Sequence, residues 1–439
     1  MSSPPVSSPH PTSWSQLISE RYLCRLSGDL VDWFDSERWR DQPIGEFSRC
    51  VTPKELLDRC PEVIWPGLMG ADLLPIIGNE FGDWLCVRLG EGNVAQEVVY
   101  WYHGGGDWLP WGQGLPEALI FNSFCSLNPT CRAGRTTQSR DGAFANTISM
   151  PQATDRHRDR VLCWAVERIG IKLEQLPSPR LPEEISVNAL LSLGIAEVPL
   201  RFLKVQKLLK HWSREMIDAT LDDNGSERAG RIDRCLFDLD LIPSQQLARL
   251  KEQSGETKVQ RWNAAAAHAR VVTEQSPEQA WAWQILGYEA EKQGQRKDAL
   301  HYYEQASQCS TFTDQTARFH FHWTEPIAAK FSVARLSAID PERIERSPYY
   351  QTLLLPDVRE RATEVRRFWI TLSHSMMQSD RPADATRCLL AAGWDVGSRS
   401  IHDYREVLEL IVEASRACGQ DARSELAATH LRCLEQRYF

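Results

Sequence analysis

Residues 73–119 read LLPIIGNEFGDWLCVRLGEGNVAQEVVYWYHGGGDWLPWGQGLPEAL, and this stretch decides the fold of the first part of the chain. In its first apolar run, Trp84, Cys86 and Arg88 fall on one face of an extended chain, and the residues between them fall on the other. A second run, over residues 98–103, alternates in the same way. A period of two is typical of β-strands. With the Gly-, Glu- and Asn-rich turn between the runs, the pattern predicts a β-hairpin in an antiparallel sheet.

Glycines mark both ends of this hairpin. Gly78 and Gly82 flank a short segment before the first run, and they predict a turn through positive φ that enters the strand at Asp83. After the second run, Gly104, Gly105 and Gly106 interrupt an aromatic cluster, which predicts a loop hinged at glycine. A rigid hairpin that ends in an aromatic loop is typical of a recognition surface.

The order and spacing of these features resemble the SUKH superfamily. Its members carry a Gly-x-x-x-Gly-Asp turn before one strand and a Trp-x-His step at the end of the next, followed by a short amphipathic helix, which here lies around residues 117–119. The resemblance covers residues 20–130, about a quarter of the chain. The matching positions are Pro75, Gly78, Asn79, Gly82, Asp83, Trp101 and His103.

This resemblance implies an α+β domain in which helices cover a curved antiparallel sheet and which acts by binding other proteins. Bacterial members of the superfamily are frequently immunity proteins that neutralise toxin domains, often nucleases, and fungal members regulate cell-wall synthesis through partner proteins. The resemblance supplies no catalytic residue. Many relatives have an acidic residue after the histidine, whereas this chain has Gly104, so the chemistry of the partner is left open.

We expect the end of the hairpin to provide the contacts to a partner protein. Aromatic side chains dominate interface energetics where a few of them are desolvated, although some of those in this segment must face the core instead. The candidate contact residues are Trp84, Tyr100, Trp101, His103, Asp107, Trp108 and Trp111.

Composition limits the class of partner. The 439 residues carry a net charge of −9, which disfavours general binding to nucleic acid or to anionic membranes and suits a basic partner such as a nuclease. The 12 cysteines have irregular spacings without a Cys-x-x-Cys pair, so we expect reduced thiols and neither a metal site nor another cofactor. Residues 1–13 lack the basic start and apolar core of a signal peptide, and no apolar run is long enough to span a bilayer. We therefore expect a cytoplasmic protein.

A second pattern lies in residues 280–306, AWAWQILGYEAEKQGQRKDALHYYEQA. Small and aromatic residues recur there at the offsets of a tetratricopeptide repeat, in which small residues let two antiparallel helices approach and aromatics fill the space between them. The residues at these offsets are Trp283, Leu286, Gly287, Ala290, Gly294, Ala299, Tyr303 and Ala306. Weaker candidate units precede this one, ending at Pro277, and follow it over residues 369–392 and 408–431. A plain helical bundle with the same packing pattern is the alternative.

The whole chain is therefore predicted as an α+β domain followed by an all-α region of tetratricopeptide-like repeats. The expected segments are a disordered tail (1–13), the SUKH-like domain (14–130), a linker (131–155), a helical connecting region (156–245) and the repeats (246–439). Before the sheet, residues 14–23 and 51–57 predict helices that cover it, the second with Thr52 as its N-cap.

Three functions are compatible with this organisation. The first is immunity or regulation through binding of another protein at the hairpin. The second is a scaffold or adaptor that acts mainly through the repeat groove. The third is an enzyme centred on His103 and Asp107, since imidazole and carboxylate are common acid–base partners. The chain lacks a phosphate-binding loop and a Gly-x-Ser-x-Gly nucleophile motif, so we favour a protein without enzymatic activity.

Overall fold

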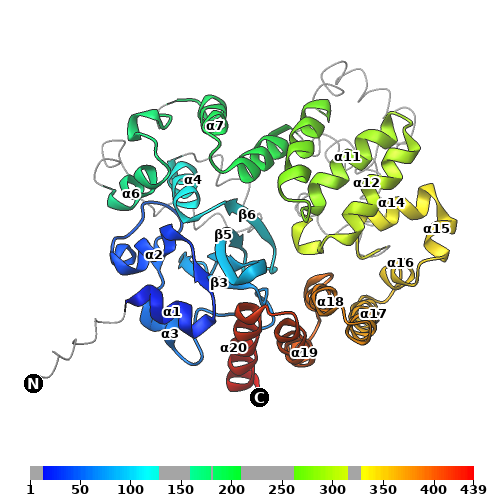
Figure 1. Ribbon diagram of the computed structural model, residues 1–439. Coiled ribbons are helices and arrows are strands. Elements are labelled where there is room, and N and C mark those ends of the chain that lie inside the picture. Colours follow the sequence, from blue (N-terminus) through cyan, green and yellow to red (C-terminus); the bar gives the residue numbers. More distant parts are fainter. Residues whose placement is uncertain (1–12, 128–158, 179–180, 209–261, 315–327) are drawn as a thin grey trace, which may run out of the picture.

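The computed structural model describes residues 13–127, 159–178, 181–208, 262–314 and 328–439. Within these ranges, a curled sheet with helices around it is followed by an all-helical region, as the sequence predicts at this level (Figure 1). The expected tail, apart from Ser13, and the whole expected linker over residues 131–155 lie outside the described residues.

The predicted hairpin is confirmed, and it forms the centre of the sheet. The strands are β1 (Arg25–Leu26), β2 (Arg49–Cys50), β3 (Leu73–Gly78), β4 (Trp84–Leu89), β5 (Val94–Trp101) and β6 (Trp108–Gly112). Their order is β1-β5-β4-β3-β2, and β6 also pairs with β5. In the hairpin, Trp84 lies opposite Trp101, and Leu85 lies opposite Tyr100.

The sheet is mixed, which corrects the expectation of an antiparallel sheet. Four of the strand pairings are antiparallel, but β1 runs parallel to β5. A parallel pair needs a long crossover, and here the chain between β1 and β5 includes helices as well as β2, β3 and β4. β1 is only two residues long, so it carries no alternating pattern that the sequence could reveal.

Helices surround this sheet, three of them where the sequence predicts a helix and one, α2, where it does not. They are α1 (Trp14–Tyr22), α2 (Gly28–Asp35), α3 (Pro53–Leu57) and α4 (Leu115–Leu127), with 3-10 turns η1 (Arg38–Arg40) and η2 (Glu91–Asn93). Thr52 caps α3 as predicted, and Glu55 completes a capping box, so two otherwise unpaired backbone N–H groups are satisfied. α4 packs against β5 and β6.

The expected connecting region also packs onto the sheet domain. Its described elements are α6 (Arg160–Arg168), η4 (Leu173–Gln175), α7 (Glu183–Ser192) and a helix over residues 197–208. α6 packs against α4, and Trp164 Nε1 donates a hydrogen bond of 2.6 Å to Asp32 Oδ2 on α2. The remaining residues of this region, 156–158, 179–180 and 209–245, lie outside the described residues.

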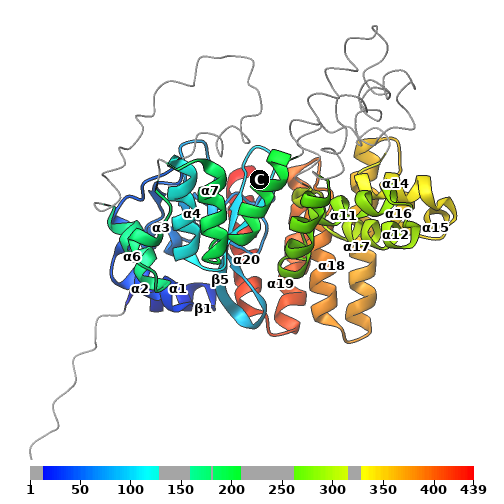
Figure 2. The ribbon, with the colours of Figure 1, turned by 90° about the horizontal axis from the view of Figure 1, so that it is seen from above.

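The C-terminal region is a succession of helices. Besides a helix over residues 262–275, they are α11 (Ala280–Lys292), α12 (Arg296–Gln308), η5 (Thr311–Thr313), α14 (Phe331–Ile339), α15 (Pro341–Glu345), α16 (Pro348–Leu353), α17 (Val358–Gln378), α18 (Pro382–Trp394), η6 (Ile401–Asp403), α19 (Tyr404–Ala417) and α20 (Asp421–Tyr438). Figure 2 shows α17, α18, α19 and α20 side by side. The predicted helix pairs α11–α12, α17–α18 and α19–α20 are present, and their identity as tetratricopeptide repeats stays a prediction.

The helical region contacts the sheet domain at both of its ends (Figure 1). At its beginning, the ring of Trp281 on α11 lies 5.1 Å from the ring of Phe202, and η5 packs against β6. At its end, α20 packs against α1 and η2. Asn93 of η2 binds the start of α20, because its side chain accepts from the Ala422 N–H at 3.0 Å and donates to the Gly419 carbonyl at 3.0 Å.

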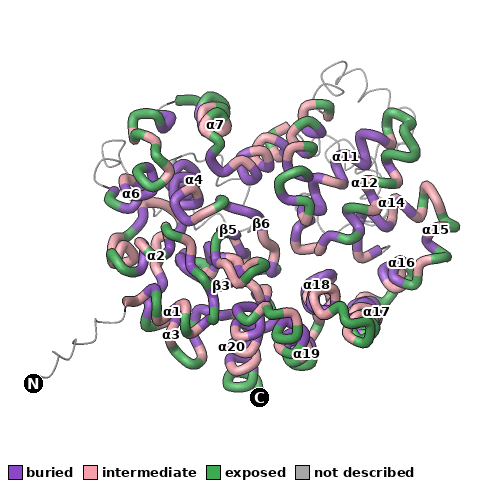
Figure 3. Tube along the Cα trace, in the orientation of Figure 1, coloured by how far each residue is buried: buried purple, intermediate pink, exposed green. Residues whose placement is uncertain are grey.

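One hydrophobic core runs through the sheet domain and into its neighbours. Every residue of β3 is buried, and in β4 only Arg88 is partly exposed (Figure 3). The same core includes Trp281 of α11 and Leu426 of α20. The sheet is therefore covered on both faces, in contrast to an antiparallel sheet with one face in water.

Candidate functional site

The turn between β3 and β4 is built around Asn79. Its side-chain oxygen accepts hydrogen bonds from the backbone N–H groups of Phe81, at 3.0 Å, and Asp83, at 2.9 Å. Gly82 has the predicted positive φ, +91°, which a side chain would make unfavourable. These contacts hold the five-residue turn in a single shape.

Gly78 is needed for a different reason from the one the sequence suggested. It is the last residue of β3, and its φ is not positive. A Cβ atom there would lie 2.7 Å from the Trp84 ring, so the strand needs glycine to let that ring pack across it. Nearby, the pairing of β3 with β4 shifts register between Pro75 and Ile77, and such an irregularity accommodates a residue without an N–H group.

His103 pairs with Asp83, and this differs from the His103–Asp107 pair considered above. Asp83 is buried, and its Oδ1 lies 2.7 Å from His103 Nδ1 and accepts from the His103 backbone N–H at 3.1 Å. Its Oδ2 accepts from the Tyr100 hydroxyl at 3.3 Å. A carboxylate at Nδ1 favours the tautomer with the proton on that nitrogen, which leaves Nε2 as an acceptor in the neutral ring. The backbone carbonyl of Asp107 accepts a hydrogen bond from the Tyr102 N–H at 2.8 Å.

The end of the hairpin presents a small surface that combines an aromatic ring with open backbone. Phe81 is 65% exposed at the apex of the Asn79 turn, and Gly104 and Gly105 are exposed on the neighbouring loop. His103 connects them, because its partly exposed ring lies 3.5 Å from the position of a Cβ atom on Gly82. We call Phe81, His103, Gly104 and Gly105 the tip surface.

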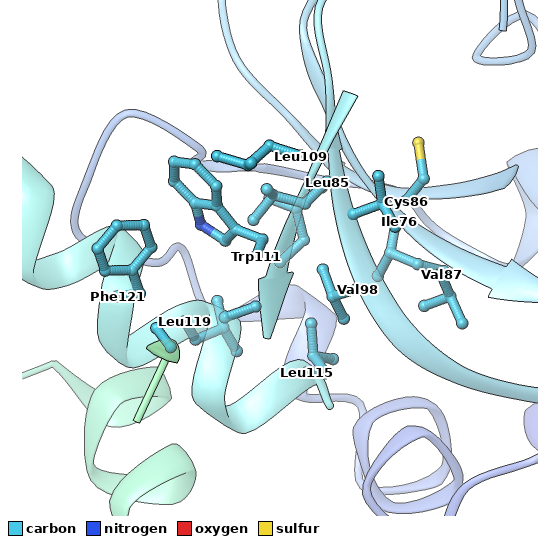
Figure 4. Packing of buried hydrophobic residues seen from close by; sticks show 14 of the residues in the cluster. Ile76, Leu85, Cys86, Val87, Val98, Leu109, Trp111, Leu115, Leu119 and Phe121 are labelled. Carbon is cyan, nitrogen blue, oxygen red and sulfur yellow. The ribbon is translucent and has the colours of Figure 1, made fainter. Parts of the chain in front are cut away.

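Three of the predicted contact residues lie inside the protein. Trp84, Trp101 and Trp111 are buried, and so they offer no area to a partner. Trp111 packs between the sheet and α4, where its ring centroid lies 4.6 Å from that of Phe121 (Figure 4). The expectation that these three residues contact a partner protein is therefore wrong, because helices cover both faces of the sheet.

The other two aromatics among those predictions are half-buried. The Tyr100 ring lies 5.1 Å from the Trp111 ring, and the Arg88 guanidinium lies 4.4 Å from the centre of the Trp108 ring. Arg88 also pairs with Glu97 at 2.6 Å and lies 3.7 Å from Glu278 before α11. Burial raises the pKa of Glu97, and the Arg88 charge opposes that shift. Trp108 therefore helps to join the sheet to the helical region.

The sequence prediction missed Phe81 and Trp65. Trp65 lies on the loop after α3, with its ring 6.2 Å from the His103 ring and 6.0 Å from the Trp101 ring. Nothing in its local sequence indicated that position. The sequence could have indicated Phe81, because it is a large apolar residue between Gly78 and Gly82. A tight turn at that point keeps its side chain away from the core.

Most of the residues at the predicted repeat offsets are buried. Leu286, Ala290, Ala299, Tyr303 and Ala306 are buried, and Gly294 has φ +72° at the turn between α11 and α12. Trp283 differs, because it is only half-buried and donates from Nε1 to the Pro277 carbonyl at 2.7 Å. The fully buried tryptophan of α11 is Trp281.

A hollow lies between α17, α18 and α19, in the part of the chain that is predicted to form repeats. It has a volume of 270 Å³ and is lined by Ser373, His374, Met377, Gln378, Leu389, Leu410, Glu413 and Ala414. Apolar side chains from three helices meet there beside the exposed Glu413. A groove of this kind can hold the side chains of a bound peptide.

The described ranges lack two kinds of feature. Those ranges hold no cluster of three His, Cys, Asp or Glu residues suited to a metal ion. Their helices also include none with both the length and the apolarity that crossing a membrane requires.

The chain matches no model of a known protein family, and no curated protein matches it either.

Proposed function

We propose that this chain is a non-catalytic, cytoplasmic protein-binding protein of the SUKH type, an immunity or regulatory protein that contacts its partner through the tip surface. The observation that carries the proposal is the exposure of Phe81 on a turn that Asn79 holds rigid. The resemblance of the turn and of the Trp101-x-His103 step to the SUKH pattern supports it.

A rigid exposed aromatic ring is suited to anchor a partner. Binding costs conformational entropy when side chains and loops become ordered, and a turn that is already fixed avoids part of that cost. Phe81 also has few neighbours to lose, since it is exposed at the apex of the turn. It can enter an apolar pocket of a partner as a hot-spot residue.

The charge around the tip surface favours a basic partner. Glu80 is exposed beside Phe81, and Glu46 accepts a hydrogen bond of 3.1 Å from the Asn79 side chain. The whole chain has a net charge of −9. We therefore propose a partner that surrounds an apolar pocket with Lys and Arg, such as the nuclease domain of a toxin.

The test compares partner capture by the intact chain and by a Phe81→Ala variant, using extracts of the cells that produce the protein. We expect the variant to lose about tenfold or more in affinity for the partner that the wild type captures, as hot-spot truncations do. The matched control is Ile185→Ala on α7, which truncates an apolar residue that is also exposed. Equal capture by wild type and Phe81→Ala would remove the tip surface from the proposal.

A scaffold or adaptor that binds through the helical groove is the second candidate. The hollow of 270 Å³ between α17, α18 and α19 favours it. If the partner binds in this groove, Met377→Glu should abolish capture, because it places a charge among the apolar residues of the hollow. Binding in the groove also predicts that Phe81→Ala leaves capture unchanged, whereas binding at the tip surface predicts that it weakens capture.

A further inference from the structure

The contact between α20 and the loop after α3 brings two cysteines together from opposite ends of the chain. Arg437 donates to the carbonyls of Pro61 and Ile64, both at 2.6 Å. One helical turn earlier, the buried Cys433 thiol lies 3.9 Å from the Pro61 carbonyl. Pro61 directly follows Cys60.

The two thiols are direct neighbours. The Cys60 thiol lies close enough to Cys433 to interact with it electrostatically, and both thiols are free. Cys60 is partly exposed, and its backbone N–H donates to Asp58 Oδ1 at 2.8 Å, which fixes the loop at this point. The structure therefore offers an accessible thiol next to a buried one, held by an interface that is already formed.

We propose that Cys60 and Cys433 form a reversible disulfide when the protein is oxidised, which joins α20 covalently to the sheet domain. With hydrogen peroxide, the Cys60 sulfur attacks one peroxide oxygen, the O–O bond breaks, and a sulfenic acid and water result. The Cys433 sulfur then attacks the Cys60 sulfur, the S–O bond breaks, and a second water leaves. The two thiols are oxidised to one disulfide, and one peroxide is reduced to two waters.

The two thiols have different roles because their surroundings differ. Cys60 reacts first, since an oxidant can reach it from solvent. Burial raises the pKa of Cys433 to about 11, which leaves little thiolate at neutral pH and slows the second step. We therefore expect the Cys60–Cys433 disulfide to form slowly at neutral pH and faster as the pH rises.

The proposed disulfide lies at one end of a loop that also supports the tip surface. The loop that begins at Cys60 also carries Trp65, whose ring contacts those of Trp101 and His103. A disulfide at one end of this loop therefore restrains both α20 and the support beneath His103.

Peptide mapping of the full-length protein tests the proposal. The protein is treated with hydrogen peroxide or oxidised glutathione, digested with trypsin without reduction, and searched for a link between residues 433–437 and the peptide that begins at Cys60. We expect this link in the wild type, its disappearance with dithiothreitol, and its absence in Cys60→Ser. Because the peptide that begins at Cys60 also contains Cys86, the variant is essential to the assignment.

Two further variants complete the experiment. Cys433→Ala should also abolish the link, while Cys388→Ser, a partly exposed cysteine on α18, should retain it. Oxidised wild type should have a higher Tm than oxidised Cys60→Ser, and the two should agree after reduction. Persistence of the link in Cys60→Ser, or its absence in wild type whose other thiols have been oxidised, would overturn the proposal.

Discussion

At the residue scale, one glycine controls how closely α11 and α12 approach. A Cβ atom on Gly287 would lie 2.6 Å from two ring carbons of Tyr303, which is fully buried and donates to Glu291 at 2.9 Å. The ring has little freedom to move, so we expect Gly287→Ala to lower the free energy of unfolding by about 1–3 kcal/mol. Urea denaturation measures this change.

Gly90→Ala is the control for that substitution. Gly90 has an extended backbone with φ −82°, and a Cβ atom there meets only the Val94 carbonyl, at 3.7 Å. Alanine should leave stability unchanged or raise it by about 0.5 kcal/mol, since it restricts the unfolded chain. Equal effects of the two substitutions would show that the close approach to Tyr303 is unimportant.

His430 makes a prediction about acid stability. It is fully buried on α20, and no described residue forms a hydrogen bond with its Nδ1 or Nε2. Burial, followed by the Arg437 charge, lowers its pKa from 6.5 to about 3. Between these values the unfolded chain binds a proton that the folded chain does not. The free energy of unfolding therefore falls as pH decreases below about 6.5, and by pH 4 the loss from this residue is about 3 kcal/mol.

Unfolding measured from pH 7 to pH 4 tests this dependence. His430→Met keeps an apolar side chain of similar size in the site and removes the titration, so its stability should fall less over that range. The exposed His374 on α17 provides the control, because His374→Gln should retain the pH dependence of the wild type. Identical profiles for wild type and His430→Met would refute the assignment.

The partner of His103 shows what a sequence leaves undetermined at this scale. Asp107 is near in the chain, but Asp83 is brought to His103 by the pairing of Trp84 with Trp101 across β4 and β5. Alternating residues indicate that two strands exist, whereas their register depends on tertiary packing. The turn residues around Asn79 could be predicted because their hydrogen bonds are local.

At the element scale, a buried ion pair connects the helical pairs. Lys330 at the start of α14 and Asp395 at the end of α18 form a salt bridge, and both are almost completely buried. Lys330 Nζ also donates to the Ser307 and Cys309 carbonyls, at 2.7 Å each, and Asp395 Oδ2 accepts from Trp369 Nε1 at 3.0 Å. This pair therefore joins the start of α14 to the ends of α12 and α18 and to the middle of α17.

Lys330→Met should destabilise the protein by about 3–5 kcal/mol in chemical denaturation, because it leaves the Asp395 charge buried without its cation. Adding Asp395→Asn should recover part of the loss, since the amide removes that charge and its oxygen still accepts hydrogen bonds. An exposed pair offers the comparison: Arg346→Met, which breaks the bridge to Glu342, should cost about 1 kcal/mol or less. A double variant no more stable than Lys330→Met would contradict this account.

The helix pairs themselves were predictable, whereas this ion pair was not. Spacing of small and aromatic residues indicated α11–α12, and Gly287 facing Tyr303 gives that spacing its physical basis. Lys330 and Asp395 are far apart in sequence, and neither lies in a recognisable motif. A polar contact between distant helix ends depends on how the pairs stack, which local periodicity does not encode.

At the scale of the whole molecule, the last helix completes the first domain. Arg21 on α1 pairs with Glu425 on α20 at 2.5 Å, and Leu426 belongs to the same core as the sheet. The sequence predicted separate domains because compositional changes mark linkers. It could not predict that α20 returns to the sheet, since amphipathic helices show which face is buried and not what covers that face.

This closure predicts that the sheet domain depends on the C-terminal helix. A chain that stops at Gln420 lacks α20 and exposes the apolar surface that α20 covers, so its sheet domain should unfold at a lower temperature than in the intact chain. Hydrogen exchange of α1 and of the loop around Pro61 should also accelerate. A chain that stops at Tyr438 removes only the exposed Phe439 and should behave like the wild type in these measurements. If the sheet domain keeps its unfolding temperature and its protection without α20, it is an independent unit, and the helical region is a separate attachment to it.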